Sequence, residues 1–368
     1  VAAEVKNFSP TDFTSGRQAK VMGRFSQFAV AAAKLAIEDS RITFTDKLSS
    51  QTNICFGNSV NGAGDVYENT HIDFLSKGLP SVPPWTCLEY TPHAASSHVA
   101  IEFELRGQAI TLSSACSSGL DVVQWGYSQI LSGKSRVVIA GSSEAPIFPF
   151  SFATLCSIGV LTKWDGHPAE ASRPYDLKRD GLVLAEGGGC VILEELDHAL
   201  DRGAPIYAEV LGFGNANESG HMRKVDLEGS ALCQAIQHAT QEAKLTPGDI
   251  DYINAHGNAM PDYDRAETTA FKTVFGEIVY NIPVSSIKSM IGQSFAVSPM
   301  FQVVSSCLTL RDSIIPPTIN YEHPDPYCDL DYVPNKARSC RIRHILINAH
   351  GMSGTHSVLI LGRADQFA

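Results

Sequence analysis

The sequence predicts a layered α/β protein. Segments with strand character alternate with segments of helical hydrophobic period along the whole chain of 368 residues. Each half of the chain repeats a strand–helix–strand order and ends on paired strands, and such alternation is typical of helices layered against sheets. The composition, 44 % hydrophobic and 18 % charged, fits a compact globule and excludes a disordered chain, collagen and a coiled coil.

In the first half, Ala-rich stretches with helical spacing predict helices, and runs of small and β-branched residues predict buried strands. The strand QAITLSSA is followed directly by CSSGLDVVQWGYSQILSG, which has a helical pattern. The predicted strands cover residues 53–60, 108–115, 135–145 and 183–196. The predicted helices cover residues 25–38, 116–133 and 197–202.

The pattern restarts near residue 203 and repeats the same order of elements. Amphipathic spacing predicts the helices, and short apolar runs bounded by turn residues predict the strands. The predicted strands cover 206–214, 251–256, 282–288 and two strands within 344–362, and the predicted helices cover 230–243, 264–276 and 293–312. We therefore expect two halves, residues 1–203 and 204–368, that share one core.

Charge and cysteine usage exclude several classes of protein. The formal net charge of −11 argues against wholesale nucleic-acid binding and against docking on anionic lipid. The sequence contains no run of 18 apolar residues, so we expect no membrane span. The first residues lack the pattern of a signal peptide. The nine cysteines are odd in number and contain no Cys-x-x-Cys pair, which is typical of a reduced cytoplasmic protein whose cysteines are mostly buried apolar residues.

Two segments carry residues suited to nucleophilic chemistry. Cys116 opens a predicted helix, where the positive end of the helix dipole stabilises a thiolate, although a buried structural cysteine is the alternative. His256 ends a predicted strand and precedes a glycine, so it is a candidate general base or hydrogen-bond donor, or a surface residue.

Two further segments carry weaker signals. Lys288 ends a predicted strand and enters a glycine-containing turn, and a lone lysine there is usually solvent-exposed. In NAHGMSGTHS, 348–357, the glycines suggest backbone amides turned toward a ligand, unless the segment is an ordinary hairpin. The EGGGC run at 186–190 is no dinucleotide fingerprint, because it enters a strand instead of a helix.

Together and in this order, these segments resemble the β-ketoacyl-acyl-carrier-protein synthases of the type II, thiolase-fold family, over essentially the whole chain. The matching motifs are SSACSSG, the stretch 173–214, NAHG followed by Asp264 and Glu267, SSIKSMIG, and IPPTINYEHPDPYCDLDYVPNKAR. The resemblance implies a duplicated thiolase fold in five layers, α-β-α-β-α. The family opens with a Val-rich strand and glycine turn upstream of residue 1, so we expect the sequence to be cropped, and the link 221–230 looks trimmed.

By the same resemblance, a cysteine thiolate accepts an acyl group from a phosphopantetheine thioester, and a malonyl thioester then decarboxylates and condenses with it. Cys116 matches the nucleophile, His256 the first catalytic histidine and Lys288 the lysine. The backbone amides of Cys116 and Met352 match the oxyanion donors. Asp264 and Glu267 match supporting acidic residues.

Several family positions differ in this chain. Gln293 stands where the second histidine is expected, and Gln302 stands where the family usually has a glutamate. Asn258 and Met260 replace two threonines that contact pantetheine. Met352 replaces the gating phenylalanine, and the turn HGMSGTH brings His350 and His356 near the site.

These differences leave three functions open. In a working condensing enzyme, Gln293 would donate a neutral N–H to the enolate oxygen, and His350 could compensate further. In a non-elongating ketosynthase, Cys116 would accept an acyl group and His256 would help pass it to another nucleophile. A non-catalytic partner subunit is the third possibility, but such chains typically lack the cysteine that is present here.

The resemblance also implies partners. We expect a dimer through the strand Gln108–Ala115, with an identical chain or a paralogous ketosynthase-like chain, and transient binding of an acyl carrier protein. No metal and no bound organic cofactor are implied, since phosphopantetheine arrives on the carrier. The acyl chain does not follow from the sequence.

Overall fold

The computed structural model describes residues 1–60 and 63–364 and builds them around two sheets. In the first sheet the described strands follow the order β3-β2-β4-β6, with β2 parallel to β3 and β4 and antiparallel pairing between β4 and β6. The bounds are β2 (Thr52–Gly57), β3 (Ala109–Leu112), β4 (Val137–Glu144) and β6 (Gly187–Glu194). Strand β3 therefore lies at one edge of this sheet.

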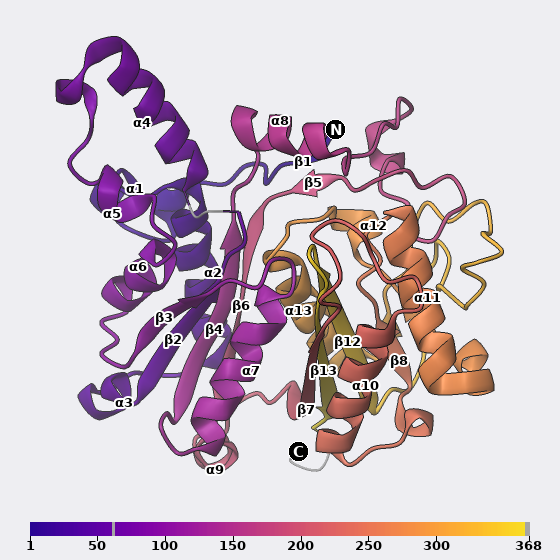
Figure 1. Cartoon of the computed structure of the whole chain (residues 1–368). Coiled ribbons are helices and arrows are strands. Elements are labelled where there is room, and N and C mark those ends of the chain that lie inside the picture. Colours follow the sequence, from indigo (N-terminus) through magenta and orange to yellow (C-terminus); the bar gives the residue numbers. More distant parts are fainter. Residues whose placement is uncertain (61–62, 365–368) are drawn as a thin grey trace.

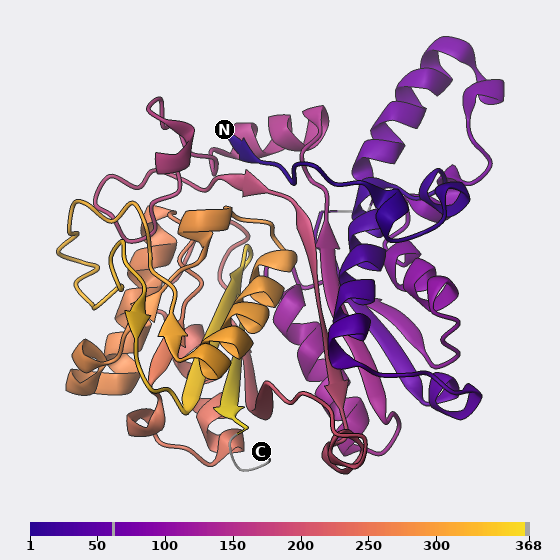
Figure 2. The same cartoon turned by 180° about the vertical axis from the view of Figure 1, so that it is seen from behind.

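The second sheet repeats this arrangement and adds a strand. Its described strands follow the order β7-β13-β12-β8-β9, in which β13 is antiparallel to both of its neighbours and β8 is parallel to β12 and β9. The bounds are β7 (Ala208–Asn217), β8 (Tyr252–Asn254), β9 (Val284–Ser285), β12 (His344–Gly351) and β13 (Thr355–Arg363). Short pairs β1 (Ala2–Ala3) with β5 (Leu184–Ala185) and β10 (Ile314–Ile315) with β11 (Arg338–Ser339) lie outside the two sheets (Figure 2).

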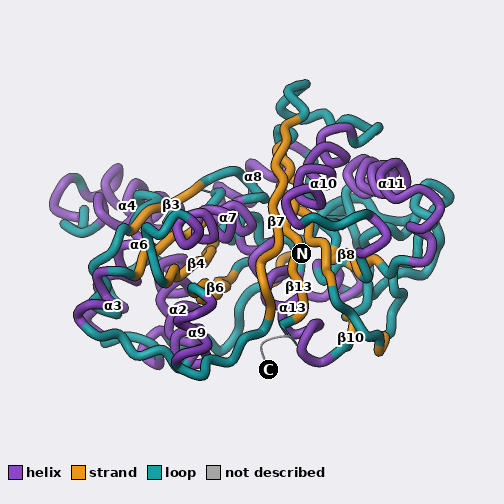
Figure 3. Tube along the Cα trace, turned by 90° about the horizontal axis from the view of Figure 1, so that it is seen from below, coloured by secondary structure: helices purple, strands orange, loops and turns teal. Residues whose placement is uncertain are grey.

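Helices form three layers around the sheets, which gives the five-layer α-β-α-β-α order of the thiolase fold. Helices α7 and α13 pack between the sheets (Figure 1), while α2 and α6 cover the outer face of one sheet and α10 and α11 that of the other (Figure 3). The bounds are α1 (Gly16–Ala19), α2 (Arg24–Ser40), α3 (Asp46–Ser50), α4 (Gly64–Lys77), α5 (Thr86–Glu89), α6 (Ala94–Glu102), α7 (Ser118–Leu131), α8 (Pro149–Ile158), α9 (Leu196–Asp201), α10 (Ser230–Ala243), α11 (Pro261–Phe275), α12 (Lys288–Ile291) and α13 (Val297–Asp312).

The central helices approach each other closely. A Cβ atom at Gly119 of α7 would lie 2.6 Å from the carbonyl oxygen of Ala296 and 2.7 Å from the backbone nitrogen of Met300, so the position has room only for glycine. The hydrophobic cluster around these helices draws buried residues from both halves, among them Leu120, Val138, Met300 and Ile347. One apolar core therefore joins the two sheets.

Three predicted boundaries were wrong near the candidate site. The strand predicted at 108–115 ends at Leu112, because the chain turns through a left-handed Ala115 at φ +54° before α7 begins. The strand predicted at 282–288 covers only Val284–Ser285, and Lys288 opens α12. The helix predicted at 293–312 begins at Val297, because residue 293 pairs with the backbone of another strand.

Candidate active site

The turn before α7 holds Cys116 at the head of a central helix. The Ser118 hydroxyl accepts a hydrogen bond from the Ser114 amide (2.9 Å) and donates one to the Ala115 carbonyl oxygen (2.7 Å). These bonds, together with the left-handed Ala115, close a tight turn between β3 and α7. Cys116 is 3 % exposed and lies two residues before the first residue of the helix.

The surroundings of the Cys116 thiol are apolar and include Phe295, Met260 and Met352. Burial raises the pKa of this thiol to about 12, although the charge of Lys288, the Met352 amide and the Gln293 side chain all lower it. Desolvation is the largest contribution to this pKa and outweighs these contacts, so the thiol keeps its proton when no substrate is bound. Stabilisation of a thiolate by the helix N-terminus stays a prediction. Nucleophilic attack requires that the thiol proton leave as the new bond forms.

His256 follows β8 and is 2 % exposed. The Glu267 carboxylate accepts a hydrogen bond from its backbone N–H (2.8 Å), and the His350 amide donates to its Nδ1 atom (3.3 Å). A neutral imidazole accepts at one nitrogen only, so this bond to Nδ1 places the ring proton on Nε2, whereas a bond accepted at Nε2 would place it on Nδ1. The Asn258 Nδ2 atom, also a donor, lies 3.2 Å from Nε2, so only one of the two contacts is a hydrogen bond in a given tautomer. Burial lowers the pKa of His256 well below its ordinary value.

Lys288 and Gln302 form a buried pair behind the site. The Lys288 Nζ atom donates to the His256 carbonyl oxygen (2.6 Å) and to Gln302 Oε1 (3.0 Å). Gln302 Nε2 donates to the carbonyl oxygens of Asn254 (2.9 Å), Ala255 (3.0 Å) and Asn348 (3.2 Å). Gln302 thus joins the end of β8 to β12 through a satisfied amide. Burial lowers the pKa of Lys288 to about 8.

Gln293 lies in the turn before α13, with its main chain fixed by extended pairing. Its amide donates to the Val183 carbonyl oxygen (2.8 Å), and its carbonyl oxygen accepts from the Ala185 amide (2.9 Å). The side chain is 2 % exposed and reaches the Cys116 thiol, whose pKa it lowers. Its Oε1 atom is buried and has no hydrogen-bond partner among the described residues. A buried acceptor without a partner is suited to a donor on a ligand.

Asp264 and Glu267 hold the backbone of the loop that carries His256. Glu267 accepts from the Gly257 amide (3.0 Å) and from the Tyr175 hydroxyl (2.5 Å), while Asp264 accepts from the amides of Asn258 (3.1 Å) and Tyr175 (2.8 Å). Burial raises the pKa of Asp264 to about 7. Both carboxylates therefore support the loop and lie behind the histidine ring.

Two residues that contact these carboxylates, Tyr175 and Arg179, were not singled out from the sequence. The Arg179 Nε atom lies 3.3 Å from Asp264 Oδ2. Both belong to the stretch RPYDLKRDG, and that density of charged residues beside a tyrosine was an available signal. Glu144 was also missed. It ends β4, accepts a hydrogen bond from the Val60 amide (3.1 Å), and burial raises its pKa to about 8. The sequence signal that could have found Glu144 is a single carboxylate at the end of a strand of small and apolar residues.

The turn of the β12–β13 hairpin completes the site. A Cβ atom at Gly351 would lie 3.5 Å from the Cys116 amide nitrogen, so the hairpin tip abuts the cysteine turn. Met352 and Met260 join the apolar cluster around Cys116, and the Met260 amide donates to Asn258 Oδ1 (3.0 Å). His350 and His356 lie further back, against Glu218.

The structure thus brings three predicted residues around the Cys116 thiol, namely Lys288, Gln293 and Met352. His256, Asn258 and His350 form an adjoining group. All nine cysteines are free, but only four are buried, three are half-buried and two are exposed, so the expectation that most would be buried was wrong. Among the described residues, no helix is long and apolar enough to cross a membrane.

Comparisons with known proteins agree along the chain. Residues 1–199 match the family profile of the β-ketoacyl synthase N-terminal domain, and residues 207–322 match that of the C-terminal domain. The chain is 36 % identical over 366 residues to 3-oxoacyl-[acyl-carrier-protein] synthase 2 of Coxiella burnetii, covering 99 % of this chain and 87 % of that protein.

Two solved structures share the fold over nearly the whole chain. One is a type II polyketide synthase acyl-carrier protein in complex with its ketosynthase bound to the hexaketide, with a TM-score of 0.90 and 31 % identity, covering 98 % of this chain and 87 % of that one. The other is the ishigamide ketosynthase/chain length factor, with a TM-score of 0.91, 31 % identity and the same coverage.

Proposed function

Because the chain belongs to the β-ketoacyl synthase family, as a ketosynthase of fatty-acid or polyketide biosynthesis, we propose that it condenses an acyl group held on Cys116 with a malonyl thioester. The observation that carries this proposal is the set of groups that surround the Cys116 thiol. Cys116 lies in an apolar cluster that suits an acyl chain, and the Met352 amide and the Gln293 side chain both reach its sulfur.

In the first half-reaction, the Cys116 sulfur attacks the carbonyl carbon of an acyl thioester carried on phosphopantetheine. The carbon–sulfur bond to pantetheine breaks, and the departing thiol takes the proton that Cys116 gives up. The negative charge that develops on the carbonyl oxygen is stabilised by the backbone amides of Cys116 and Met352. The approach of the Gly351 turn to the Cys116 amide supports this pairing of donors.

In the second half-reaction, a malonyl thioester loses carbon dioxide, and the enolate carbon attacks the acyl group on Cys116. The product is a β-ketoacyl thioester on the carrier, and the Cys116 thiolate is released. His256 Nε2–H and the Gln293 side-chain amide are the donors for the enolate oxygen. The bond from the His350 amide to His256 Nδ1 supports this tautomer of His256. Lys288, bonded to the His256 carbonyl oxygen, is assigned an electrostatic role.

Phosphopantetheine reaches the site on an acyl carrier protein, and Asn258 and Met260 are the residues proposed to line its path. The relative in which a ketosynthase is complexed with an acyl-carrier protein supports this partner.

A second copy, or a paralogous chain, is proposed to pair through β3. Two observations support a dimer: β3 is an edge strand that leaves Ile110 half-buried, and the projecting helix α4 exposes Ile72, Phe74 and Leu75 by 55 %, 44 % and 70 % (Figure 1). The relative that pairs a ketosynthase with a chain length factor supports a heterodimer as the alternative. Ile110→Glu should convert a dimer to monomer in light scattering, and an unchanged mass would contradict an interface at β3.

One observation favours a second function, transfer of the acyl group without elongation. The Asn258 Nδ2 atom, an N–H donor, lies 3.2 Å from His256 Nε2; when it donates there, Nε2 is an acceptor and cannot donate to a malonyl oxygen. If that contact persists in the loaded enzyme, His256 serves acyl transfer to another nucleophile and malonyl thioester is not used.

Intact-protein mass spectrometry after incubation with acyl-carrier-protein thioesters separates these functions, with Cys116→Ala as control. A condensing enzyme forms an adduct on Cys116 that malonyl-carrier protein discharges as a β-ketoacyl product. An adduct that malonyl-carrier protein does not discharge identifies the transacylase. If no acyl length gives an adduct, the catalytic roles assigned above are wrong and the chain is a partner subunit.

A further inference from the structure

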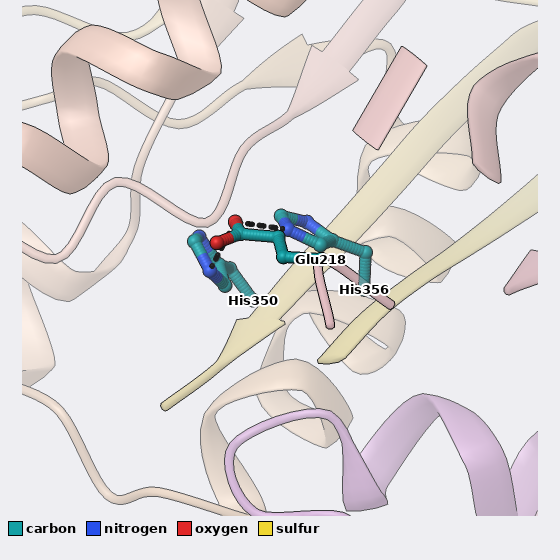
Figure 4. Close-up of side chains that lie close together, drawn as sticks. All are labelled: Glu218, His350 and His356. Atoms are coloured by element: carbon teal, nitrogen blue, oxygen red, sulfur yellow. Dashed lines mark hydrogen bonds and ion pairs between the residues drawn. The ribbon is translucent and has the colours of Figure 1, made fainter. Parts of the chain in front are cut away.

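Three side chains meet beside the active site in a cluster that the proposed condensation does not use. Glu218 follows β7, His350 lies on β12 and His356 lies on β13 (Figure 4). His350 and His356 are paired directly across the β12–β13 ladder, so their side chains share one face of the sheet. The Glu218 amide donates to the Gly354 carbonyl oxygen (2.9 Å), which anchors the carboxylate beside the hairpin tip.

The donor atoms of this cluster converge on one point. Glu218 Oε1 lies 2.9 Å from His356 Nε2 and 3.3 Å from His350 Nε2, and the three ligand atoms all lie within 4.8 Å of one another. A tetrahedral zinc ion with bonds of about 2.0–2.1 Å separates its ligand atoms by about 3.3 Å. The two separations from Glu218 Oε1, 2.9 and 3.3 Å, are therefore close to what such an ion requires.

The burial and the orientation of these three side chains also suit a bound metal ion. The side chains of Glu218, His350 and His356 are only 5 %, 5 % and 2 % exposed. The Asp226 amide donates to Glu218 Oε2 (3.0 Å), which leaves Oε1 directed at the two rings. His356 Nδ1 is buried without a partner among the described residues, so Nε2 is the ring nitrogen that holds His356 by a hydrogen bond. An ion bound to His356 Nε2 would hold the ring in the position that its contact with Glu218 now maintains.

We propose that Glu218, His350 and His356 bind a divalent ion of the zinc class. Two imidazoles and one carboxylate suit zinc and its neighbours among the first-row transition metals, and they do not suit magnesium or calcium, which prefer oxygen ligands. The sequence implied no metal because the pattern of HGMSGTH does not reveal Glu218, more than 130 residues upstream of both histidines.

The role of the ion is to position the hairpin, since none of its three ligands touches the Cys116 thiol among the contacts that set its pKa. His350 also carries the amide that bonds to His256 Nδ1, and its ring packs against Tyr263 with centroids 4.4 Å apart. An ion that ties His350 to His356 and Glu218 would hold the turn that carries the Met352 amide. The binding site itself does not depend on the proposed condensation.

The test is metal binding by the full chain after treatment with a chelator. We expect one equivalent of Zn²⁺ in calorimetry, a rise in the melting temperature, and a visible absorption spectrum of tetrahedral cobalt when Co²⁺ replaces zinc. Glu218→Gln and His356→Asn should each weaken binding at least about tenfold. His98→Asn is the matched control, because His98 Nε2 lies 2.7 Å from Glu89 in a pair that has no third ligand in the part of the chain that the structure describes. This variant should bind as the wild type does.

Each other result overturns the proposal. Absence of binding by the wild type would leave the cluster as a hydrogen-bonded triad. Binding that both variants retain, or a cobalt spectrum with a thiolate charge-transfer band, would assign the ion to cysteines such as the exposed Cys87 and Cys156. Circular dichroism of the metal-free variants shows whether they fold, and the cobalt spectrum of the wild type tests the ligand set independently of any substitution.

Discussion

Replacing Gln293 by leucine isolates the contribution of one side-chain amide to the reactivity of Cys116. Leucine keeps the approximate volume, and the main-chain bonds of residue 293 to Val183 and Ala185 do not depend on the side chain. Gln293 Oε1 has no partner among the described residues, so the substitution removes no second hydrogen bond. Its effect therefore reports the contact between the amide and the thiol.

The magnitude follows from the charge of the acceptor. A hydrogen bond to a charged group contributes about 1.5–3 kcal/mol, and one pKa unit corresponds to about 1.4 kcal/mol. Removal of the donor should therefore raise the pKa of Cys116 by about one to two units above its present value of about 12. At a pH below both values, the thiolate fraction falls about tenfold for each unit, so alkylation of Cys116 should slow by about 10–100-fold.

The assay is the pH dependence of iodoacetamide labelling, followed by peptide mass spectrometry. The exposed Cys87 in the same protein is the internal control, and its labelling rate should not change. Equal labelling of Cys116 in wild type and Gln293→Leu, within a factor of two at every pH, would refute the role given to this amide. A parallel slowing at Cys87 would instead indicate a general change in the protein.

Three further predictions concern buried groups behind the site. Below pH 8 Lys288 is charged in the folded and the unfolded chain, and between pH 8 and 10.5 only the unfolded chain keeps the proton. The free energy of unfolding of the wild type should therefore rise with pH relative to that of Lys288→Met, by up to about 3 kcal/mol. Urea titrations at pH 7 and 10 measure this difference. A constant difference would contradict the lowered pKa. Tyr175→Phe removes the bond to Glu267 and should lower the free energy of unfolding by about 1.5–3 kcal/mol, whereas an unchanged urea midpoint would show that this bond contributes nothing net. Gly214→Ala would bring a Cβ atom 1.9 Å from the Ala235 carbonyl oxygen, so it should cost more than about 4 kcal/mol or prevent folding, and a normal melting temperature would show that α10 can move away.

Local pattern predicted most of the elements, because strand and helix periods are written in neighbouring residues. The helix predicted at 230–243 coincides with α10, and that predicted at 25–38 lies within α2. The family resemblance predicted the thiolase fold, and similar solved structures confirm it. Boundaries failed where a residue serves a distant partner, as at Gln293, whose backbone pairs with the segment around Leu184. The division at residues 203 and 204 stays a prediction.

The outlying elements were not predicted. Helix α4 buries none of its residues, so it lacks the apolar stripe by which a helix is recognised in sequence. Glu144 and Tyr175 were missed at the site because their hydrogen-bond partners lie far away in the chain, where no local period shows them.

The sequence by itself determined which residue types are available and the order of the elements that carry them. It singled out Cys116 at the start of a helix and His256 at the end of a strand, because both positions follow from local pattern. Only the tertiary structure decided how these groups behave. Burial raises the pKa of Cys116 to about 12, Gln302 is engaged by Lys288 and three carbonyl oxygens while Gln293 faces the thiol, and Glu218 joins two histidines distant from it in the chain. Desolvation and contacts across strands depend on how the chain closes on itself, and no local pattern encodes them.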